Sequence, residues 1–304
     1  MNNTISLVIV TFNRSALLKE MLHSVTLQTI KPDHVFIVDN NSSDNTKDVI
    51  SQFIAESSQF LSISYHNTGE NLGGAGGFEF GSRLAFEKGY EWIWLADDDI
   101  VLTPPCLEEL CKHFASGDIL QPIRMNIDGT CAEISGVDYE INNILRLNPK
   151  KIRVVDLFDK KWDTLPIKTI PFEGPLINRK VFTSIGFPNK EFFIFYDDLD
   201  FAIRARNAGF KIQCVKNSVI IRKIKFIQSL ALNSWKGYFM YRNFFKVQLK
   251  YSYRLIAITR IIMIFSLVFL HSLFTGRIKS IHILLHALKD AFAKDFPINS
   301  KFKP

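Results

Sequence analysis

Short apolar runs that alternate with helical patterns are the feature that most constrains how this chain can fold. Residues Ile5 to Val10 and Val35 to Val38 are continuously apolar and rich in β-branched side chains, which is typical of strands covered on both faces. Between them, Ala16 to Gln28 places its apolar side chains at helical spacing. A second helical pattern follows near Lys47 to Ala55. This alternation predicts βαβ units with right-handed crossovers, and therefore an α/β fold with a mostly parallel central sheet flanked by helices.

Polar residues follow three of the expected strands. The first strand is followed by Thr11 to Arg14, the second ends at Asp39, and the strand Glu91 to Ala96 ends in three consecutive aspartates, Asp97 to Asp99. In open α/β sheets, ligands bind at the carboxyl ends of the strands. These segments are therefore the first candidates for a binding site.

The three consecutive aspartates carry the strongest chemical signal. Their mutual repulsion destabilises a fold unless a cation or a phosphate chemistry uses them. Carboxylate oxygens favour Mg²⁺ or Mn²⁺, which binds substrate phosphates through one or two carboxylates. Because alternate residues of a strand point the same way, Asp97 and Asp99 can share one ion while Asp98 points elsewhere. A solvated acidic turn before a helix near Pro104 is the competing interpretation.

A glycine-rich segment, Asn71 to Phe78, precedes a further helical pattern. Its glycines allow close backbone approach, and a helix N-terminus favours an anion. The segment is no Walker loop, because no Lys-Ser or Lys-Thr pair follows, and it does not follow the first strand as a dinucleotide fingerprint would. We expect Gly73 and Gly74 to contact a bound anion, with a flexible turn as the alternative.

A second acidic cluster, Asp197, Asp198 and Asp200, opens a predicted helix that ends at Gly209. The helix dipole and the free N-H groups of the first turn favour the ionised carboxylate. One of these aspartates can therefore act as a base without a large rise in its pKa. For Asp200 we expect instead an ion pair with Arg204, one helical turn later.

The charge of the chain is divided unevenly. Residues up to Ile221 contain 22 basic and 28 acidic side chains, whereas Arg222 to Pro304 contain 15 Lys and Arg against 2 Asp. The net charges, −6 up to Ile221 and +13 from Arg222 onward, predict an acidic globular part followed by a basic, surface-seeking tail. We divide the chain into residues 1–222 and residues 223–304. Nucleic acid is not an expected partner, because no nucleic-acid module is recognisable.

The tail has features of a helical membrane-surface segment. Its apolar run, Ile261 to Phe274, is shorter than the roughly 20 residues that a spanning helix needs. Basic and aromatic side chains interleave before it and suit an anionic cytoplasmic leaflet; they are Lys246, Lys250, Arg254, Phe244, Phe245, Tyr251 and Tyr253. The alternative is a helical subdomain that packs on the globular part or on a second protomer, so a homo-oligomer stays open.

The cellular setting is predicted from the N-terminus and the cysteines. The N-terminal segment lacks a basic region and a long apolar core, so export is not indicated. Four cysteines without a CxxC pair are typical of buried thiols in a reducing cytosol. We expect a cytoplasmic protein at the inner face of the plasma membrane.

Five motifs in a fixed order extend this reading: TFNR, VDNNSSDNT, NLGGAGGF, WLADDD and FYDDLDFAIRARNAGF. The ordered set resembles the family 2 glycosyltransferases of the GT-A fold and covers about residues 4–222. Together with YFMYRN, Tyr238 to Asn243, it looks most like the branch that contains bacterial galactofuranosyltransferases and rhamnosyltransferases. The resemblance implies a Rossmann-like nucleotide-binding half and a C-terminal helical extension.

The resemblance also implies a metal-dependent, inverting transfer of a sugar from a nucleotide diphosphate to an acceptor hydroxyl. Asp97 and Asp99 would hold Mn²⁺ or Mg²⁺, and Asp198 would be the general base with Asp197 supporting it. The residues that would bind the donor are Thr11, Asn13, Arg14, Asp39, Gly73, Gly74, Asp97, Asp98 and Arg242.

Two departures from the family pattern bear on the chemistry. The family often supplies a histidine to the metal after the last sheet strand, but Asn217 to Lys225 contains none. Arg222 lies near that place and can bind the diphosphate directly. The QxxRW signature of processive synthases is also absent, so we expect transfer of one or a few residues.

The expected reaction is transfer of galactofuranose from UDP-galactofuranose to a lipid-linked glycan of a bacterial surface polysaccharide. Two alternatives stay open: a rhamnosyltransferase that uses dTDP-rhamnose, and a non-catalytic module that binds a nucleotide sugar or a glycan.

Overall fold

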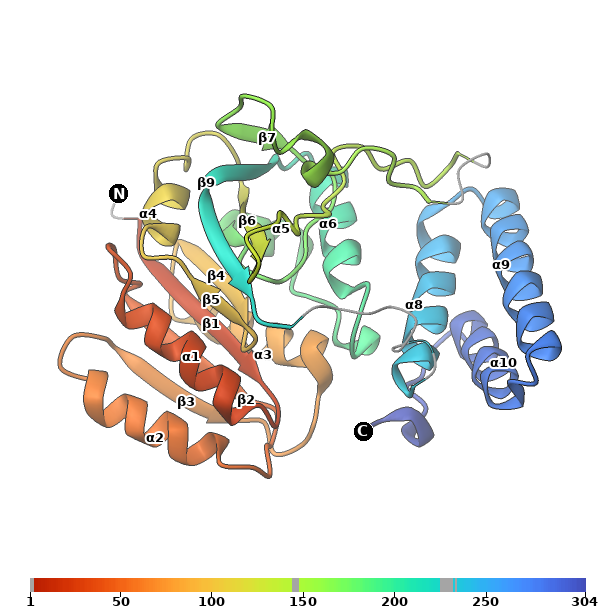
Figure 1. Cartoon of the computed structure of the whole chain (residues 1–304), viewed down its shortest axis with the longest axis horizontal. Helices are drawn as coiled ribbons and strands as arrows, with labels where there is room; N and C mark the ends of the chain where they lie inside the picture. Colours follow the sequence, from red (N-terminus) through yellow and green to blue (C-terminus); the bar gives the residue numbers. More distant parts are fainter. Residues whose placement is uncertain (1–2, 144–147, 225–231, 233) are drawn as a thin grey trace.

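The computed structural model describes residues 3–143, 148–224, 232 and 234–304. Figure 1 shows an α/β part followed by the C-terminal helices α8, α9 and α10, with α8 lying between α6 and α9. The catalytic candidates belong to the α/β part, whereas most of the basic tail forms the helices.

The first half of the α/β part is a parallel sheet. Strands β1 (Ile5–Thr11), β2 (His34–Asp39), β3 (Ile63–Asn67) and β4 (Trp92–Asp97) are arranged in the order β3-β2-β1-β4. Helices α1 (Ser15–Thr26) and α2 (Thr46–Ser57) pack on the face that carries Leu7 and Ile9. Helix α3 (Gly73–Glu87) packs on the other face, against Val8 and Val10. The continuous apolar runs of the sequence are explained by this burial on both faces.

The second half of the sheet is mixed. Strand β8 (Leu176–Asn178) pairs antiparallel with β4 and with β6 (Ile119–Asn126), and β6 runs parallel to β9 (Ile212–Arg222). Strands β5 (Ile100–Leu102) and β7 (Thr164–Pro166) pair antiparallel with β9. Helices α4 (Cys106–Cys111), α5 (Arg179–Ile185) and α6 (Asp197–Asn207) and the short turns η1 (Val154–Leu157) and η2 (Lys190–Phe192) complete this half. The predicted α/β class with helices around a central sheet is confirmed, and its antiparallel pairs all lie on the β8 and β9 side.

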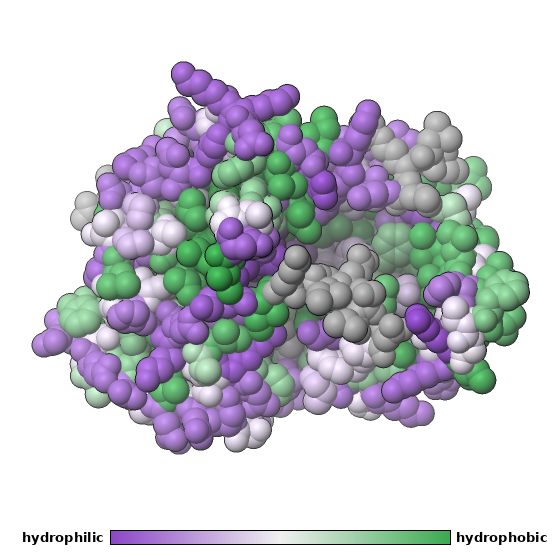
Figure 2. Space-filling model, in the orientation of Figure 1, coloured by the Kyte–Doolittle hydropathy of each residue, from purple (hydrophilic) through white to green (hydrophobic). Residues whose placement is uncertain are grey.

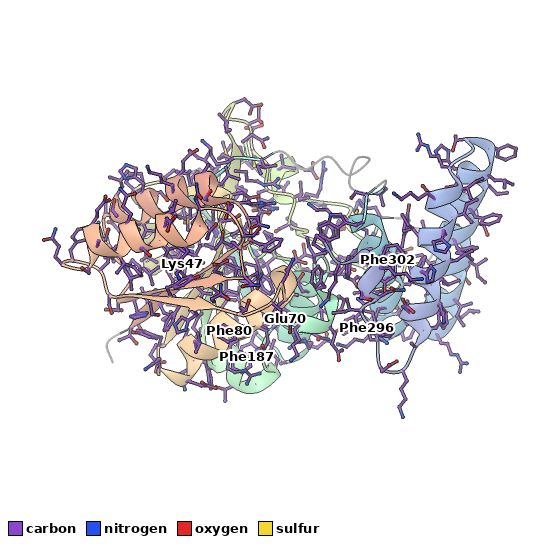
Figure 3. The ribbon with its side chains drawn as sticks, turned by 90° about the horizontal axis from the view of Figure 1, so that it is seen from below. Lys47, Glu70, Phe80, Phe187, Phe296 and Phe302 are labelled. Carbon is purple, nitrogen blue, oxygen red and sulfur yellow. The ribbon has the colours of Figure 1, made fainter. Side chains whose placement is uncertain are left out.

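The C-terminal helices are α8 (Lys236–Tyr251), α9 (Arg254–Phe274) and α10 (Ile278–Phe292), followed by the turn η3 (Ser300–Phe302). Helix α8 buries Tyr238, Phe239 and Phe245, and both α9 and α10 pack against it. Phe296, labelled in Figure 3, lies between the α/β part and α9, with its ring 5.3 Å from that of Phe192. Aromatic packing therefore joins the helices to the α/β part.

Helix α9 is longer than the apolar run that the sequence indicates, because it begins at Arg254. By length and composition, α9 is the one helix within the described ranges that could cross a membrane. About a fifth of the residues in its most apolar stretch are buried inside the protein.

Candidate active site

The carboxyl ends of β1, β2 and β4 lie at one edge of the sheet. Thr11 is opposite Asp39 in the β1-β2 register, and Val10 is opposite Asp97 in the β1-β4 register. The three segments that the strand-end rule selects are therefore neighbours in space.

Asp98 joins the end of β4 to the end of β1. The Thr11 hydroxyl donates to Asp98 Oδ2 at 2.8 Å, and the Phe12 N-H donates to the same oxygen at 3.4 Å. Thr11 and Asp98 are only 1% and 3% exposed. Their atoms are used to hold the edge together, which corrects the expectation that these two side chains bind the donor.

Arg14 lies across the acidic cluster. Its Nη1 atom is 3.0 Å from Asp98 Oδ1 and 2.9 Å from Asp99 Oδ2, and its side chain is 38% exposed. Although burial opposes it, attraction by Asp98 and Asp99 raises the pKa of the guanidinium. Arg14 is thus a predicted nucleotide-binding residue whose side chain is both charged and partly exposed at this edge.

Asp39 and Asn13 organise the loop after β2. The buried Asp39 carboxylate accepts from the Ser42 N-H at 2.8 Å and from the Tyr65 hydroxyl at 2.9 Å. Asn13 has a left-handed backbone, with φ of 52°, and its Oδ1 accepts from the Ser43 N-H at 2.7 Å. Both residues lie at the edge where the sequence places a nucleotide, and Tyr65 is a partner that the motif analysis did not identify.

Asp97 and Asp99 differ in their partners, because Asp99 pairs with Arg14 whereas no ion pair within the described residues joins Asp97 to a Lys or Arg side chain. Burial raises the pKa of Asp97 well above its usual range, and repulsion by Asp99 and Glu173 adds to the rise. No group of three or more His, Cys, Asp and Glu side chains in the described ranges is arranged to hold a metal ion. Two adjacent carboxylates that repel each other nevertheless fit a divalent cation whose remaining ligands are water or phosphate oxygens. The predicted pair can therefore hold Mg²⁺ or Mn²⁺ as a two-carboxylate site.

Glu173 acts on both acidic clusters through its charge, and the sequence analysis did not assign it a role. The Gly174 N-H donates to the Leu95 carbonyl oxygen, and the Leu95 N-H donates to the Pro175 carbonyl oxygen, so the β4-β8 pairing brings Glu173 level with Asp97. Repulsion by Glu173 raises the pKa of Asp97 and also that of Asp198. Glu173 is therefore close to both clusters, which share one region of the molecule.

Two arginines hold Glu173 in place. Arg124 Nη1 is 3.1 Å from Glu173 Oε1, and Arg222 Nε is 2.8 Å from Glu173 Oε2. Arg124 is itself fixed by a buried ion pair with Glu133. Arg222 pairs with Ile100 in the sheet, next to Asp99, so it lies beside the acidic cluster as the sequence comparison expects. Lys225, the last residue of the histidine-free stretch, is outside the described residues.

Asp198 is the second residue of α6 and lies in its first turn. Burial raises its pKa to about 6, although the Leu199 N-H, at 2.6 Å from Oδ1, and the charges of Lys150 and Arg124 act in the opposite direction. The expectation of a base without a large pKa rise is thus corrected, because desolvation outweighs the helix dipole here. Burial and repulsion by Asp198 raise the pKa of Asp197 as well. A carboxylate with a pKa near 6 suits a general base at neutral pH.

Asp200 has the structural role that its spacing predicts. Arg204 Nε is 2.8 Å from its Oδ2, one helical turn away. Its Oδ1 accepts from Lys250 Nζ at 2.7 Å and from the Tyr251 hydroxyl at 2.6 Å, both from α8. Lys250 and Tyr251 therefore contact the α/β part, while the Lys250 side chain stays 40% exposed.

Two other residues of the expected membrane face also have partners inside the protein. Lys246 Nζ lies 3.2 Å from the Ala293 carbonyl oxygen and 4.7 Å from the Phe296 ring centroid, and Phe245 is fully buried. The exposed apolar side chains lie instead on α9, α10 and the turn between them; they are Leu255, Ile262, Leu267, Leu270, Leu273, Phe274, Ile278, Leu285 and Phe292. We call this set the outer apolar face.

The loop before Asp197 is strained. Phe193, Phe195 and Tyr196 have φ of 63°, 65° and 68°, a left-handed conformation that costs an L-residue about 1–2 kcal/mol. We call residues 192–196 the aromatic loop. Neighbouring elements must stabilise it, because the conformation is unfavourable by itself.

The glycine-rich segment packs directly against the aromatic loop. A Cβ atom on Gly73 would lie 2.2 Å from the Phe193 carbonyl oxygen, and the Ala75 N-H donates to that oxygen at 3.0 Å. The Gly73 N-H donates to Asn71 Oδ1, and its carbonyl accepts from Asn40 Nδ2. Gly73 is therefore used in packing, which corrects its assignment to the donor. A Cβ on Gly74 would meet no atom within 4 Å, so Gly74 still offers an open approach.

Arg242 is the clearest misassignment among the predicted site residues. Its side chain is fully buried, and its guanidinium donates to the carbonyl oxygens of Glu191, Phe296 and Pro297. Every one of these partners belongs to the protein backbone, so Arg242 has no surface from which to bind a donor.

Figure 2 shows the surface hollowed between the α/β part and the C-terminal helices, with hydrophobic residues gathered over the outer end of those helices.

Comparison with known proteins identifies this arrangement. The sequence model described as Glycosyl transferase family 2 matches residues 6–182. Galactofuranosyltransferase GlfT1 of Mycolicibacterium smegmatis is 29% identical over 205 residues, which cover 66% of this chain and 65% of that protein. The dTDP-rhamnosyl transferase RfbF of Shigella flexneri is 25% identical over 227 residues, which cover 74% and 70% of the two chains. The chain thus spans slightly less than two thirds of the mycolicibacterial relative.

Solved structures give the same fold. A crystal structure of S. aureus TarS matches with a TM-score of 0.53 at 15% identity, covering 81% of this chain and 40% of that one. GalNAc-T7, solved with UDP, GalNAc and Mn²⁺, matches with a TM-score of 0.57 at 14% identity, covering 79% and 50%. Likeness at this identity shows the fold alone, and that fold is GT-A.

Proposed function

We propose that this chain, which belongs to glycosyl transferase family 2, is a nucleotide-sugar glycosyltransferase that transfers a sugar with inversion to a hydroxyl group of a lipid-linked glycan. One observation carries the proposal: the β4-β8 pairing brings Glu173 level with Asp97, and besides burial the charge of Glu173 raises the pKa of both Asp97 and Asp198. A site for a departing diphosphate and a site for a proton acceptor are therefore neighbours.

The donor binds at the strand edge in this proposal. Arg14, partly exposed beside Asp98 and Asp99, donates to the diphosphate oxygens, since a guanidinium forms strong charge-assisted hydrogen bonds with phosphate. Asp97 and Asp99 would hold Mg²⁺ or Mn²⁺, and the bound ion would neutralise the negative charge that grows on the leaving group.

Asp198 provides the base. At neutral pH a carboxyl group with a pKa of about 6 is mostly ionised, and it can take the proton of an acceptor hydroxyl. As that O-H bond breaks, the oxygen forms a bond to the anomeric carbon, and the bond from this carbon to the diphosphate oxygen breaks with its electron pair. A single displacement of this kind inverts the configuration of the sugar.

The proposed donor is UDP-galactofuranose, and the process is synthesis of a bacterial surface polysaccharide. The name of the mycolicibacterial relative supports this choice, and the name of the Shigella relative supports dTDP-rhamnose as the second candidate. The side chains that select a sugar are a property of the individual pocket, so the donor has to be measured.

The proposed location is the inner surface of the plasma membrane, with the outer apolar face against the lipid. Its nine exposed apolar side chains lie on two neighbouring helices and the turn between them, and exposed apolar patches are typical of interaction sites. Basic side chains surround it, namely Arg254, Arg277, Lys279, Lys289 and Lys294, against a single exposed acid, Asp295. Each cation near an anionic leaflet contributes about 1 kcal/mol of binding.

Membrane recovery tests this part of the proposal. Replacing Leu270 and Phe274 by Ser, in the outer apolar face, should shift the protein from the membrane fraction to the soluble fraction, whereas Thr259→Ser on the same helix should not. Alkaline carbonate should extract the wild type. Resistance to extraction would instead make α9 a spanning helix, and unchanged recovery of the double variant would contradict a lipid contact at this face.

A donor screen tests the central activity. Thermal unfolding with UDP-galactofuranose, dTDP-rhamnose and other UDP and dTDP sugars, with and without Mn²⁺, should reveal one donor that raises the melting temperature more when the ion is present. That donor should then release its nucleoside diphosphate when a lipid-linked acceptor is added. If a donor binds but no acceptor causes release of its nucleoside diphosphate, the result would favour a non-catalytic protein that binds a nucleotide sugar.

A further inference from the structure

We propose that Asn243, on α8, is a positioning residue that holds the aromatic loop and thereby fixes Asp198 against the donor edge. The proposal rests on the function above, and it gives the C-terminal helices a part in turnover besides any contact with a membrane.

The contacts of Asn243 converge on the aromatic loop. Its Nδ2 atom lies 2.9 Å from the Phe192 carbonyl oxygen, 2.8 Å from that of Ile194 and 2.9 Å from that of Phe195. The side chain is fully buried, where hydrogen bonds are not replaced by water. One amide group from a distant helix is therefore the common partner of three carbonyls in a five-residue loop.

Arg242 orients this amide. Its Nη1 donates to Asn243 Oδ1 at 2.7 Å, which leaves the amide nitrogen directed at the loop. Its Nη2 donates to the Glu191 carbonyl oxygen at 3.0 Å, just before the loop begins. Arg242, which the resemblance assigns to the donor, and its neighbour Asn243 in the YFMYRN motif thus both bond the backbone of the aromatic loop or the residue before it.

The strain of the loop explains why such a partner is needed. Phe193, Phe195 and Tyr196 all have positive φ. The carbonyls of Phe192, Ile194 and Phe195 converge on Asn243 only while that conformation persists. Their aromatic rings add packing on α8, since the Phe193 ring stacks on Phe239 at 4.8 Å. Without the amide, the loop has fewer contacts that favour the strained conformation over an ordinary extended one.

The aromatic loop connects the two parts of the site. On one side, Phe193 contacts Gly73 and Ala75 at the beginning of α3. On the other, Tyr196 immediately precedes Asp197 and Asp198. Helix α8 holds the far side of Asp200 through Lys250 and Tyr251. Asp198 therefore sits between two anchors from α8, and a shift of about 1 Å in a catalytic group can cost about 10²-fold in rate.

The test compares two variants of Asn243 with a matched control in the same helix. Asn243→Asp keeps the size of the side chain and its contact with Arg242 but has no N-H to donate. Asn243→Ala removes the side chain. The control, Tyr238→Phe, keeps the ring and removes a buried hydroxyl of α8 whose hydrogen bonds are with Asp290, Pro297 and Asn299.

Both Asn243 variants should lower kcat by about 10- to 100-fold, with the KM for the donor and the Kd for UDP changed less than about threefold. Tyr238→Phe should retain the wild-type kcat. Equal kcat in Asn243→Asp and Tyr238→Phe would overturn the proposal, and so would a loss of UDP affinity as large as the loss of kcat, because Asn243 would then support the whole fold.

Hydrogen exchange supplies a readout that does not require turnover. Backbone amides of residues 192–199 should exchange faster in Asn243→Asp than in Tyr238→Phe, while amides of β1 and β4 exchange alike in the two variants. Unchanged exchange in this loop would contradict the proposal even for an active enzyme. If the wild type transfers no sugar but the loop amides respond as expected, the proposed function fails while the positioning role of Asn243 stands.

Discussion

The two acidic clusters of this protein contain the same residue type but occupy different backbone settings. Asp97 to Asp99 lie at the end of a sheet strand, where Asp98 and Asp99 repel Asp97 and pair with a partly exposed arginine, Arg14. Asp197 and Asp198 open a helix behind a strained loop, and no lysine or arginine in the described residues forms an ion pair with Asp198. The first setting concentrates negative charge that attracts a cation, whereas the second favours a carboxyl group that can hold a proton.

This difference teaches that the position of an aspartate in the fold decides its chemistry. At the strand end, burial raises the pKa of Asp97, repulsion by its neighbouring carboxylates adds to the rise, and a nearby cation would relieve that repulsion. On α6, burial is the main cause of the raised pKa, and the charges of Lys150, Arg124 and Glu173 adjust it. Glu173, held by Arg124 and Arg222, contributes to the raised pKa of both Asp97 and Asp198.

The largest expected effect comes from removing the base. Asp198→Asn should lower turnover by about 10²–10⁴-fold, because the acceptor hydroxyl then loses its proton acceptor. Release of nucleoside diphosphate in the presence of acceptor measures this. Asp200→Asn, two residues further along α6, is not a neutral comparison because it breaks an ion pair with Lys250 of α8. The matched control is Asp295→Asn, which changes an exposed aspartate. Normal turnover in Asp198→Asn would remove the functional distinction between the clusters.

A smaller effect is expected from pH. The base acts when it is ionised, so kcat should fall about tenfold per pH unit below a pKa of about 6 and level off above it. Glu173→Gln removes a negative charge near Asp198, which should lower that pKa and shift the acid limb of the kcat profile toward lower pH. A shift toward higher pH would show that Glu173 does not act on Asp198 through its charge.

The smallest expected effect is on stability. Because the pKa of Asp198 is higher in the folded protein than the usual 3.8, ionisation of this group destabilises the folded state as pH rises through this range. Asp198→Asn should therefore increase the free energy of unfolding by about 1–2 kcal/mol at pH 7, and the gain should vanish near pH 4. Denaturant unfolding of the two proteins at both pH values measures it. A loss of stability at pH 7 would mean that the carboxylate is compensated in the folded state.

The sequence predicted those parts of the fold that depend on local pattern. Strands such as β1 and β4 are recognisable because burial on both faces demands continuous apolar runs, and α6 ends before Gly209, which has φ of 85°. The strand-end rule located Arg14, Asp39 and the aspartates of β4, because the ends of parallel strands meet at one edge.

Contacts between distant segments were not predictable in this way. Residues 121–169 show only a weak hydrophobic pattern; Lys150 lies within this region and Glu173 follows it. Only the β4-β8 pairing brings Glu173 level with Asp97. Lys250 has the composition of a surface cation, yet it pairs with Asp200, fifty positions earlier. Arg242 likewise finds backbone carbonyls as partners. A buried cation cannot be distinguished from an exposed one until its partner is placed beside it.

Calorimetric binding of UDP to single variants of the two clusters, with Mn²⁺ present, tests the central claim most directly. Asp97→Asn and Asp99→Asn should weaken UDP binding about tenfold or more, because they remove ligands for the ion that holds the diphosphate, whereas Asp198→Asn should bind UDP within about twofold of the wild type. Equal weakening in all three variants, or weakening by Asp198→Asn alone, would contradict the assignment of one cluster to the donor and the other to the acceptor proton.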